Sequence, residues 1–184
     1  IVSDGLEDVT AISGRMERID EGQDFTAIVD FAHTPNALEN ALETCLTMLD
    51  ADQRVIAVFG SAGLRDVEKR RMMAEISARM AHITVLTAED PRTESLDDIL
   101  QMMATACESV GGVEGKTFYR VPDRGEALYR ACQLAKKGDI VVACGKGHEQ
   151  SMCFGTVEHP WDDRDALRAA LRGAPLKTLP TANV

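Results

Sequence analysis

The chain has 184 residues, of which 45% are hydrophobic and 27% charged, a balance typical of a globular protein with a buried core. Its formal net charge of -10 argues against a surface that binds nucleic acid. No apolar stretch approaches the roughly 18 residues that a membrane span needs, and the sequence shows no signal-peptide pattern. We therefore expect a cytoplasmic protein without a nucleic-acid or membrane partner.

The cysteine pattern indicates a reducing environment. The five cysteines are an odd number, no two form a Cys-x-x-Cys pair, and three lie within apolar helix or strand patterns. We therefore expect neither a disulfide framework nor a zinc site. The first residue is Ile rather than Met, which favours a chain cut from a longer protein.

The first half of the chain alternates strand and helix patterns. Val9–Ile12 is a candidate short strand, and residues 14–17 form a turn into a second one. A strand at Phe25–Phe31 precedes a helix that Thr34 caps, with Pro35 at its first position, where the missing N–H is not needed. The next elements expected are a strand at 54–59, a helix at 67–80 and a strand at 82–87.

The second half continues this alternation. Ser95 and Asp123 occupy capping positions before two helices, which we expect to end at Gly111 and Gly138. The remaining expected elements are a short strand near 117–121, a strand at 140–144, a hairpin-like excursion at 150–157, and a helix that Asp162 caps and that runs to about Arg172. Residues 173–184 contain two prolines and no periodicity, which predicts little order.

Strands that alternate with helices predict an α/β fold, with a mostly parallel, Rossmann-like sheet covered by helices on both faces. In such sheets ligands bind beyond the carboxyl ends of the strands. Four predicted strand ends lead into polar or charged loops, at residues 29–35, 59–66, 88–92 and 145–149. We expect these loops to meet and form one site.

The negative net charge of the chain is compatible with a local basic cleft. Cationic residues lie in or just after these loops, at Arg65, Lys69, Arg70, Arg71, Arg92 and Lys146. For residues 69–71 the alternative is a solvated helix face, because charges in a helix usually point to water.

The first two loops are ambiguous when each is considered alone. Asp30 and His33 precede a helix N-terminus, a position suited to hydroxyl or anion contacts. The structural alternative is that Asp30 and Thr34 only cap that helix. The pair Gly60 and Gly63 is a weak signal, because glycines are common in turns between a strand and a helix.

The last two loops combine acids with a cation. Residues 89–92 place Arg92 next to acids on a rigid turn, which suits either a zwitterionic ligand or an internal ion pair. His148 and Glu149 are adjacent and lack a third ligand, which is poor evidence for a metal. We favour Glu149 as a receptor for an ammonium group.

Residues 112–117 contain Gly-Lys-Thr but do not form a phosphate-binding P-loop. The motif requires a glycine where this chain has Val110, and here the loop runs from a helix to a strand. No other Gly-Lys-Ser/Thr occurs, so the chain has no recognisable phosphate cradle of its own.

Taken together, these residues resemble the C-terminal domain of the Mur ligases, most closely the MurE type, UDP-N-acetylmuramoyl-tripeptide synthetase. The matching blocks follow the family order and comprise residues 14–17, 30–38, 59–60, 63–70, 90–94, 145–149 and 162–164. The resemblance implies three segments: residues 1–13, the end of a preceding domain or a linker; residues 14–172, the amino-acid-adding domain; and residues 173–184, a tail.

The resemblance implies an ATP-dependent acid–amino-acid ligase of peptidoglycan synthesis. In such ligases ATP phosphorylates the terminal carboxylate of UDP-N-acetylmuramoyl-L-Ala-D-Glu, and the amine of the incoming amino acid attacks the acyl phosphate. The N-terminal domain holds the UDP-sugar, and the central domain holds the P-loop and Mg²⁺. Because this chain resembles only the third domain, we expect no catalytic residue and no metal ligand in it, and no activity from the fragment alone.

Site roles follow from the same resemblance. Arg15 and Asp30 match positions that contact the adenosine part of ATP, with His33 beside them. Mg²⁺ is expected to bind mainly to the central domain, which this chain lacks. The partners implied are the UDP-N-acetylmuramoyl-dipeptide, a diamino acid, and the N-terminal and central domains of the same ligase.

The amino acid is implied to lie among the other loops. Arg65 matches an arginine that holds the carboxylate of the incoming amino acid, and Arg92 one that reads the distal carboxylate of meso-diaminopimelate. Gly145 and Glu149 match a backbone contact and an acidic receptor for the distal group.

The sequence departs from the family pattern at residues 89–92. The diaminopimelate-adding pattern is Asp-Asn-Pro-Arg, whereas this chain has Glu89 and Asp90 before Pro91 and Arg92. Arg92 favours a second carboxylate on the substrate, and Asp90 favours a plain ammonium, as on lysine or ornithine. Asp90 could instead neutralise Arg92. We favour meso-diaminopimelate, with lysine or ornithine as alternatives.

Two other functions remain open on the sequence alone. One is a related ATP-dependent amide ligase, such as a folylpolyglutamate or cyanophycin synthetase. The other is a stand-alone module that binds an amino acid or nucleotide without catalysis. A Gly-Lys-Thr/Ser loop in the coding sequence upstream of Ile1 would support a ligase, and an initiator Met next to Ile1 would support the module.

Overall fold

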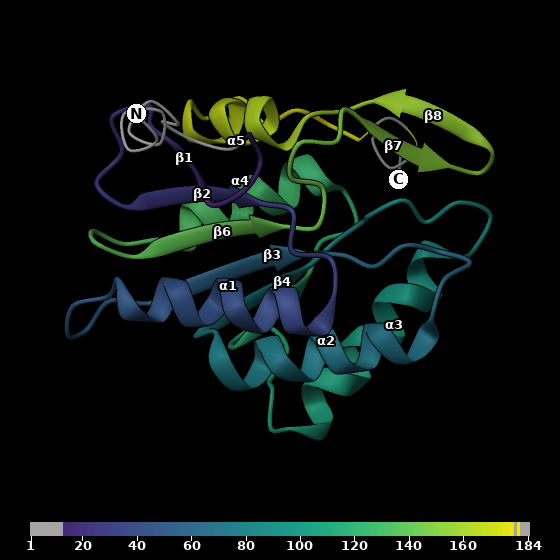
Figure 1. Cartoon of the computed structure of the whole chain (residues 1–184), viewed down its shortest axis with the longest axis horizontal. Helices are drawn as coiled ribbons and strands as arrows, with labels where there is room; N and C mark the ends of the chain where they lie inside the picture. The colour runs from purple at the N-terminus through teal and green to yellow at the C-terminus, as the bar shows by residue number, and fades with distance from the viewer. Residues whose placement is uncertain (1–12, 179, 181–184) are drawn as a thin grey trace, which may run out of the picture.

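The computed structural model describes residues 13–178 and 180. Its elements in chain order are β1 (Glu17–Ile19), β2 (Thr26–Asp30), α1 (Pro35–Thr47), β3 (Val55–Phe59), α2 (Val67–Met80), β4 (Ile83–Leu86), α3 (Leu96–Ser109), β5 (Phe118–Arg120), α4 (Arg124–Leu134), β6 (Ile140–Cys144), β7 (Ser151–Phe154), β8 (Val157–Pro160) and α5 (Asp163–Leu171). The main sheet has the order β1-β2-β6-β3-β4-β5, and β7 and β8 form a separate hairpin (Figure 1). β1 is antiparallel to β2 and the other neighbours are parallel, which confirms the predicted α/β fold.

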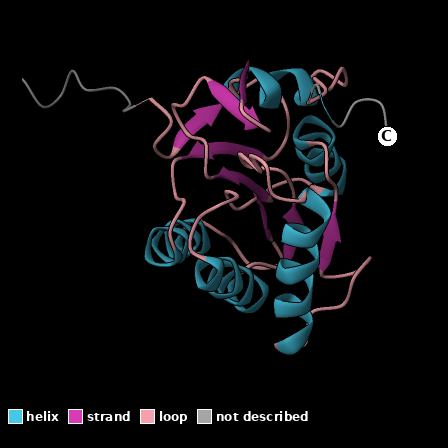
Figure 2. Cartoon of the chain, turned by 90° about the vertical axis from the view of Figure 1, so that its right-hand side faces the viewer, coloured by secondary structure: helices cyan, strands magenta, loops and turns pink. Residues whose placement is uncertain are grey.

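Helices cover both faces of the main sheet. The path from β2 through β3 and β4 to β5 advances in one direction, and its connecting helices α1, α2 and α3 lie on one face. The chain then returns from β5 to β6 through α4, which lies with α5 on the opposite face (Figures 1 and 2). Because parallel crossovers are right-handed, reversing the direction of travel moves the connecting helix to the other face.

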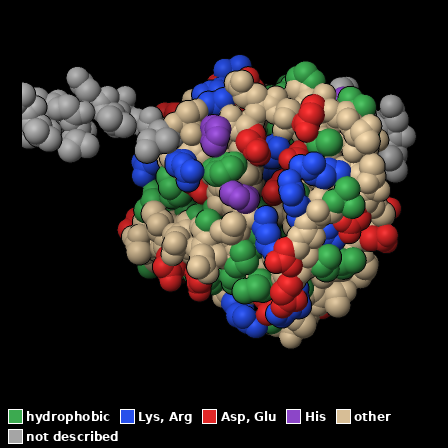
Figure 3. All heavy atoms as spheres, turned by 45° about the vertical axis from the view of Figure 1, so that its right-hand side comes forward, with side chains coloured by type: hydrophobic (Ala, Val, Ile, Leu, Met, Phe, Trp, Pro, Cys, Tyr) green, Lys and Arg blue, Asp and Glu red, His purple; other side chains and the backbone are tan. Residues whose placement is uncertain are grey.

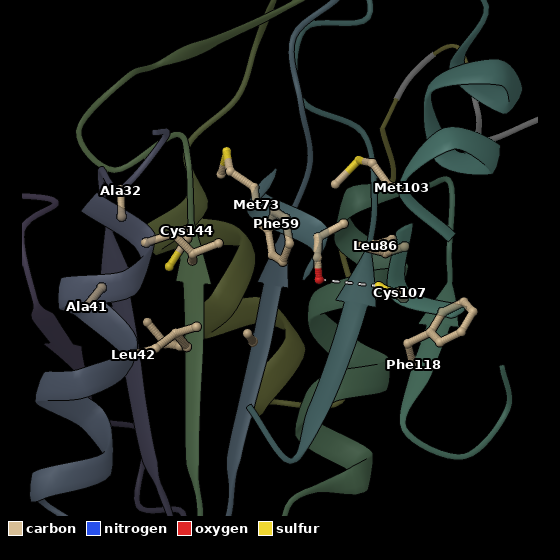
Figure 4. Packing of buried hydrophobic residues seen from close by; sticks show 14 of the residues in the cluster. Ala32, Ala41, Leu42, Phe59, Met73, Leu86, Met103, Cys107, Phe118 and Cys144 are labelled. Carbon is tan, nitrogen blue, oxygen red and sulfur yellow. Dashed lines mark hydrogen bonds between the residues drawn. The ribbon is translucent and has the colours of Figure 1, made fainter. Parts of the chain in front are cut away.

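The central strands divide their side chains between two cores. Every residue of β3 and β6 is buried, as expected for strands covered on both sides. Val142 and Cys144 of β6 join the core under α1, α2 and α3, whereas Val141 and Ala143 join the core under α4 and α5. Figure 4 shows part of the first core, where the Cys107 thiol donates to the Ala74 carbonyl at 3.6 Å.

The helix starts agree with the sequence analysis. Side chains of the expected capping residues accept hydrogen bonds from backbone N–H groups in the first turn of α1, α3, α4 and α5, and these residues are Thr34, Ser95, Asp123 and Asp162. The predicted bounds of α2 are confirmed. α4 ends at Leu134 and not at Gly138, because Ala135 is extended and Asp139 accepts the Lys136 N–H, which turns the chain into β6.

The segments near the ends of the chain are partly described. The turn before Glu17 leads into β1 as predicted, whereas the candidate strand Val9–Ile12 lies outside the described residues. Little order was predicted after Gly173. Residues 174–178 indeed form no helix or strand, but the Thr178 N–H donates to Asp123 at 2.6 Å, and Lys177 pairs with Glu126 at 3.0 Å. This part of the tail is therefore held against the start of α4.

None of the helices within residues 13–178 and 180 combines the length and the apolar content that crossing a membrane requires.

Candidate functional site

β6 marks the point where neighbouring strands lead to opposite faces of the sheet. Its neighbours β2 and β3 lead into α1 and α2 on one face, whereas β6 leads through the β7–β8 hairpin to α5 on the other. The register pairs Asp30 with Cys144 and Phe59 with Leu86, so the loops that follow emerge along one edge. A crevice for ligands is expected at such a point.

A cleft of about 420 Å³ lies at this edge, within the size range of ligand sites. The four loops singled out in the sequence all line it, through Phe31, His33 and Thr34 after β2, Ala62, Arg65, Asp66 and Lys69 after β3, Glu89, Asp90 and Arg92 after β4, and Gly145 and Glu149 after β6. Figure 3 shows charged side chains of both signs gathered on this side of the molecule, with two histidines beside them. The structure therefore brings the four loops together into one site.

Six of the eight predicted site residues line the cleft: His33, Arg65, Asp90, Arg92, Gly145 and Glu149. The other two do not. The Asp30 carboxylate, 9% exposed, accepts hydrogen bonds at 2.8 Å from the Met16 and Ala32 N–H groups, and so holds the turn before β1. It does not cap α1; Thr34 alone does so, accepting from Ala37. Arg15 lies over the Phe31 ring, 5.4 Å from its centroid.

Aromatic rings form a small cluster at the β2 side of the cleft. The Phe31 ring lies 4.5 Å from the His33 ring and 4.8 Å from the His148 ring, measured between centroids. Together with Arg15 these three rings offer flat apolar faces and a cation. Sequence analysis placed His33 here but missed the part of Phe31 and His148, which only the packing of two separate loops brings together.

Lys146 is an internal cation under the loops. Its side chain is 2% exposed, and its ammonium contacts both oxygens of Asp90 at 3.1 and 3.0 Å and a Glu149 oxygen at 3.1 Å. Asp90 also accepts the Cys153 N–H at 2.8 Å. Asp90 is therefore paired with Lys146 and not with Arg92, so the alternative in which Asp90 neutralises Arg92 does not occur.

Arg92 sits on a constrained turn. Asp90 and Arg92 both have positive φ angles, +41° and +55°, which is unusual for residues other than glycine. The turn is tied to the β7–β8 hairpin, because the Arg92 N–H donates to Cys153 and the Arg92 carbonyl accepts from Gly155. The Arg92 Nε is buried and has no hydrogen-bond partner within the described residues. The hairpin thus supports the site, a role that the sequence did not indicate.

Glu89 is a buried acid at the base of the cleft. Its side chain is 6% exposed, and neither carboxylate oxygen accepts a hydrogen bond from residues 13–178 or 180. Burial raises the pKa of Glu89 to about 7, although the positive charges of Arg124, Lys69 and Lys146 oppose that rise. Gly145 is required above it: a Cβ there would lie 2.2 Å from Glu89 Oε2, and its φ is +112°.

Arg124 locks two of the strand ends in place. It is fully buried and pairs with Asp163 at 2.7 and 2.6 Å, while it also donates to the carbonyls of Ala88 and Cys144 at 3.1 and 2.9 Å. Trp161 donates to the same Asp163 carboxylate at 2.8 Å. Sequence analysis missed Arg124. The available signal was a cation in the first turn of a helix, where the dipole disfavours it unless it is paired.

The predicted basic residues in α2 and just before it have different environments. Arg65 and Lys69 line the cleft, and neither forms an ion pair within the part of the chain that is described. Arg70 is buried and pairs with Glu94, and this pairing, with the Leu64 N–H, lowers the pKa of Glu94 to about 2. Arg71 lies on the exposed helix face and pairs with acids of its own helix, as the alternative interpretation expected.

Comparison with known proteins identifies the family. Residues 14–147 match the model described as Mur ligase, glutamate ligase domain. The chain belongs to the Mur ligase family. The match covers most of the described domain and includes all four loops of the cleft except the last two residues of the fourth.

Similar proteins carry two related names. The chain is 45% identical over 166 residues to a UDP-N-acetylmuramyl-tripeptide synthetase of Roseiflexus sp. (strain RS-1), covering 90% of this chain and 32% of that protein. It is 37% identical over 179 residues to a UDP-N-acetylmuramoyl-L-alanyl-D-glutamate--2,6-diaminopimelate ligase of Geobacter metallireducens (strain ATCC 53774 / DSM 7210 / GS-15), covering 91% and 35%. A solved structure of a ligase with the latter name superposes with a TM-score of 0.77 at 33% identity, over 92% of this chain and 34% of that one. The chain thus spans about a third of the length of these relatives.

Proposed function

We propose that this chain is the amino-acid-adding domain of an ATP-dependent ligase that joins a diamino acid to UDP-N-acetylmuramoyl-L-Ala-D-Glu in cytoplasmic peptidoglycan synthesis. The observation that carries the proposal is the cleft at the switch point, in which Arg65, Lys69 and Arg92 have no ion-pair partner among the described residues. Cations left unpaired in a cleft suit carboxylates of a ligand. The names of the relatives at 45% and 37% identity support this substrate class over a folate or cyanophycin ligase and over a non-catalytic module.

The contacts of Asp90 favour meso-diaminopimelate as the amino acid. Asp90 is paired with Lys146, so the positive charge of Arg92 remains available, and the buried Arg92 Nε lacks a hydrogen-bond acceptor. A distal carboxylate on the ligand would pair with the Arg92 guanidinium at the cleft surface, whereas lysine and ornithine have no distal carboxylate. In this proposal Arg65 holds the other carboxylate, and Gly145 and Glu149 contact the distal end.

ATP is proposed to lie on the β2 side of the cleft. The rings of Phe31, His33 and His148 fit a flat aromatic base, and Arg15 supplies a cation next to them. Asp30 would act by holding the turn that carries Arg15, since its oxygens already accept two backbone N–H groups. When bound, ATP supplies the phosphoryl group that activates the carboxylate of the peptide.

Within residues 13–178 and 180 there is no group of three or more His, Cys, Asp or Glu side chains arranged to hold a metal ion. In this proposal Mg²⁺ and the P-loop belong to the central domain of the ligase, and the 184-residue chain alone is expected to release no ADP.

The test is an assay of the chain expressed with the coding sequence that precedes it. ADP release should depend on UDP-N-acetylmuramoyl-L-Ala-D-Glu and on the amino acid, with kcat/KM highest for meso-diaminopimelate. Arg92→Ala should lower kcat/KM for meso-diaminopimelate much more than for L-lysine, because only the former has a distal carboxylate. Absence of ADP release with meso-diaminopimelate, lysine and ornithine alike would refute the proposed function, and equal losses for both substrates would refute the role of Arg92.

A further inference from the structure

The tail after α5 is bound to the first turn of α4. Thr178, only 3% exposed, donates its backbone N–H to Asp123 at 2.6 Å, and its hydroxyl accepts the Arg124 N–H at 3.0 Å. Lys177 adds an ion pair with Glu126 at 3.0 Å. The first N–H groups of a helix have no acceptor within the helix, so the Thr178 hydroxyl serves as a cap of α4 that comes from 54 residues away.

Gly125 in the same turn leaves room for the tail. A Cβ added to Gly125 would lie 1.5 Å from the carbonyl oxygen of Leu176 and 2.5 Å from its carbonyl carbon. Glycine is otherwise less favourable than alanine within a helix. The close approach of the tail therefore gives a specific physical reason for a glycine at this position.

The residue that the tail caps also supports the cleft. The Arg124 guanidinium donates to the carbonyls of Ala88 and Cys144 at 3.1 and 2.9 Å. These two residues directly precede Glu89 and Gly145, which line the cleft from the loops after β4 and β6. Because the guanidinium group is planar and its donors have a fixed geometry, it sets the distance between the two carbonyls.

Arg124 is anchored at both ends. Its guanidinium pairs with Asp163 of α5 at 2.7 and 2.6 Å, and Trp161 donates to the same carboxylate at 2.8 Å. Its backbone N–H is bound by Thr178. A shift of the first turn of α4 would move the Cα from which the guanidinium extends, so the spacing of the two loops depends on both anchors.

We propose that Thr178 is a positioning residue of the cleft: it holds the first turn of α4, so that Arg124 keeps the loops after β4 and β6 at their spacing. This inference goes beyond the proposed function and does not depend on the identity of the ligand, because neither Thr178 nor Arg124 lines the cleft. It gives a role to a tail in which the sequence predicted little order.

Two signals report the position of Arg124 without a ligand. Its Nε–H donates to Asp163 at 2.7 Å within a fully buried pair, so it should exchange slowly with solvent. Glu89 of one loop lies against Gly145 of the other, and burial raises the pKa of Glu89 to about 7. The charged groups around Glu89, whose effects on this pKa are smaller, are Arg124, Lys69, Lys146 and Asp90. If the loops separate, water reaches the carboxylate, and its pKa should fall towards the ordinary value of 4.5.

The experiment uses the isotope-labelled 184-residue chain and NMR. Gly125→Ala blocks the docking of the tail, and Thr178→Val removes the hydroxyl while it keeps the shape of the side chain. Thr178→Ser keeps the hydroxyl and should restore the wild-type behaviour. Lys177→Ala is the matched control, because it removes the exposed ion pair of the same segment and leaves the contacts of Thr178 in place.

Three quantities are measured for each variant. The pKa of Glu89 is taken from its carboxyl carbon shift between pH 4 and pH 9, with Glu89→Gln to identify the signal. The exchange rate of the Arg124 Nε–H is measured near neutral pH, and the free energy of unfolding is measured in urea. The pKa in the folded chain does not respond to a general loss of stability, so it separates positioning from stabilisation.

Gly125→Ala and Thr178→Val should each lower the pKa of Glu89 by about 1 and speed the exchange of the Arg124 Nε–H about tenfold, the effect expected from the loss of one hydrogen bond on a local opening. Thr178→Ser and Lys177→Ala should match the wild type. If helix propensity alone mattered, Gly125→Ala would stabilise the chain and change neither signal, which would overturn the proposal. It would also be overturned if Thr178→Val lowered the free energy of unfolding and left the pKa of Glu89 unchanged, or if Lys177→Ala changed both signals as much as Thr178→Val does.

Discussion

A buried acid lies near each end of β6: Asp139 precedes the strand, and Glu89, from the loop after β4, lies next to Gly145 at its carboxyl end. The pKa values of these two acids shift in opposite directions. At the amino end Asp139, 2% exposed, accepts hydrogen bonds from the Lys136 N–H and from the backbone and guanidinium of Arg54, at 2.6 to 3.1 Å. At the carboxyl end Glu89, 6% exposed, accepts none from the described residues. Burial alone would raise the pKa of both, but the bonds to Asp139 lower its pKa, whereas that of Glu89 rises to about 7.

Hydrogen bonding therefore distinguishes Asp139, which stabilises the fold, from Glu89, which lines the cleft. Similar burial gives opposite pKa shifts, because hydrogen bonds to the charged form decide which form the protein favours. Asp139 ties the start of β6 to the start of β3, so its bonds are complete without any ligand. Glu89 lies at the edge where the ligand crevice is expected, and there an incomplete set of bonds is compatible with binding.

The largest effect on stability is expected from Arg124→Ala, which breaks the completed charge pair at the carboxyl end. Removing the cation leaves Asp163 buried and unpaired and frees the carbonyls of Ala88 and Cys144, so the free energy of unfolding should fall by about 3–5 kcal/mol. Urea unfolding followed by circular dichroism measures this. Arg168→Ala is the control, because its pair with Asp165 is exposed and should contribute under about 1 kcal/mol. Equal losses in the two variants would contradict the structural role of Arg124.

A second prediction concerns Glu89→Gln and pH. The pKa of Glu89 is about 7 in the folded chain and close to its ordinary value of 4.5 when unfolded, so the folded state binds the proton more tightly. Stability from this group therefore decreases as pH rises from about 4.5 to 7, by about 3 kcal/mol in total. Glu89→Gln removes this loss, so the variant should gain stability relative to wild type between pH 4 and pH 8. Urea unfolding midpoints of the two proteins across that range test this prediction. A difference in midpoint that does not change with pH would refute the buried and unpaired state of the Glu89 carboxylate.

Asp139→Asn changes the acid at the amino end of β6 and should lower the free energy of unfolding, whereas Glu89→Gln should raise it. The amide cannot accept the same set of N–H groups and loses the charge opposite Arg54, so the free energy of unfolding should fall by about 2 kcal/mol near neutral pH. The pKa of Asp139 lies below its ordinary value in the folded chain, so its contribution is present above that value and disappears as pH falls. The difference between the variant and wild type should therefore shrink in acid, as urea unfolding would show. A difference that grows in acid would contradict this.

The smallest effect is expected from Gly145→Ala. Its φ of +112° is strained for alanine, and the new Cβ would meet Glu89 Oε2, so the free energy of unfolding should fall by about 1–2 kcal/mol. The control is Gly111→Ala, where φ is +93° but nothing lies within 4 Å of the added Cβ. Both variants share the backbone strain. Under the proposed function, only Gly145→Ala should also weaken the binding of meso-diaminopimelate, as an amide-shift titration would show. Equal affinities of the two variants for meso-diaminopimelate would contradict a contact between Gly145 and the ligand.

Much of the fold was predictable because its signals are local. Capping residues such as Thr34 and Ser95 precede the helices that they start, and the apolar runs of β3 and β6 are typical of strands buried on both faces. The end of α4 was wrong by four residues, since Asp139 turns the chain through a hydrogen bond that no periodicity reveals. Six of eight site residues could be placed in one cleft because strands of a parallel sheet end at the same edge.

The sequence by itself determined the alternation of strands and helices, the loops that carry charge, and the resemblance to the Mur ligases. Only the tertiary structure decided how those charges pair. It paired Asp90 with Lys146 and left the side chains of Arg92 and Glu89 without a hydrogen-bond or ion-pair partner among the described residues. It also directed the Asp30 carboxylate to the backbone N–H of Met16. The physical reason is that strand and helix signals arise between residues close in sequence, whereas a salt bridge such as Asp90–Lys146 joins loops 56 residues apart and depends on the distance between them in space.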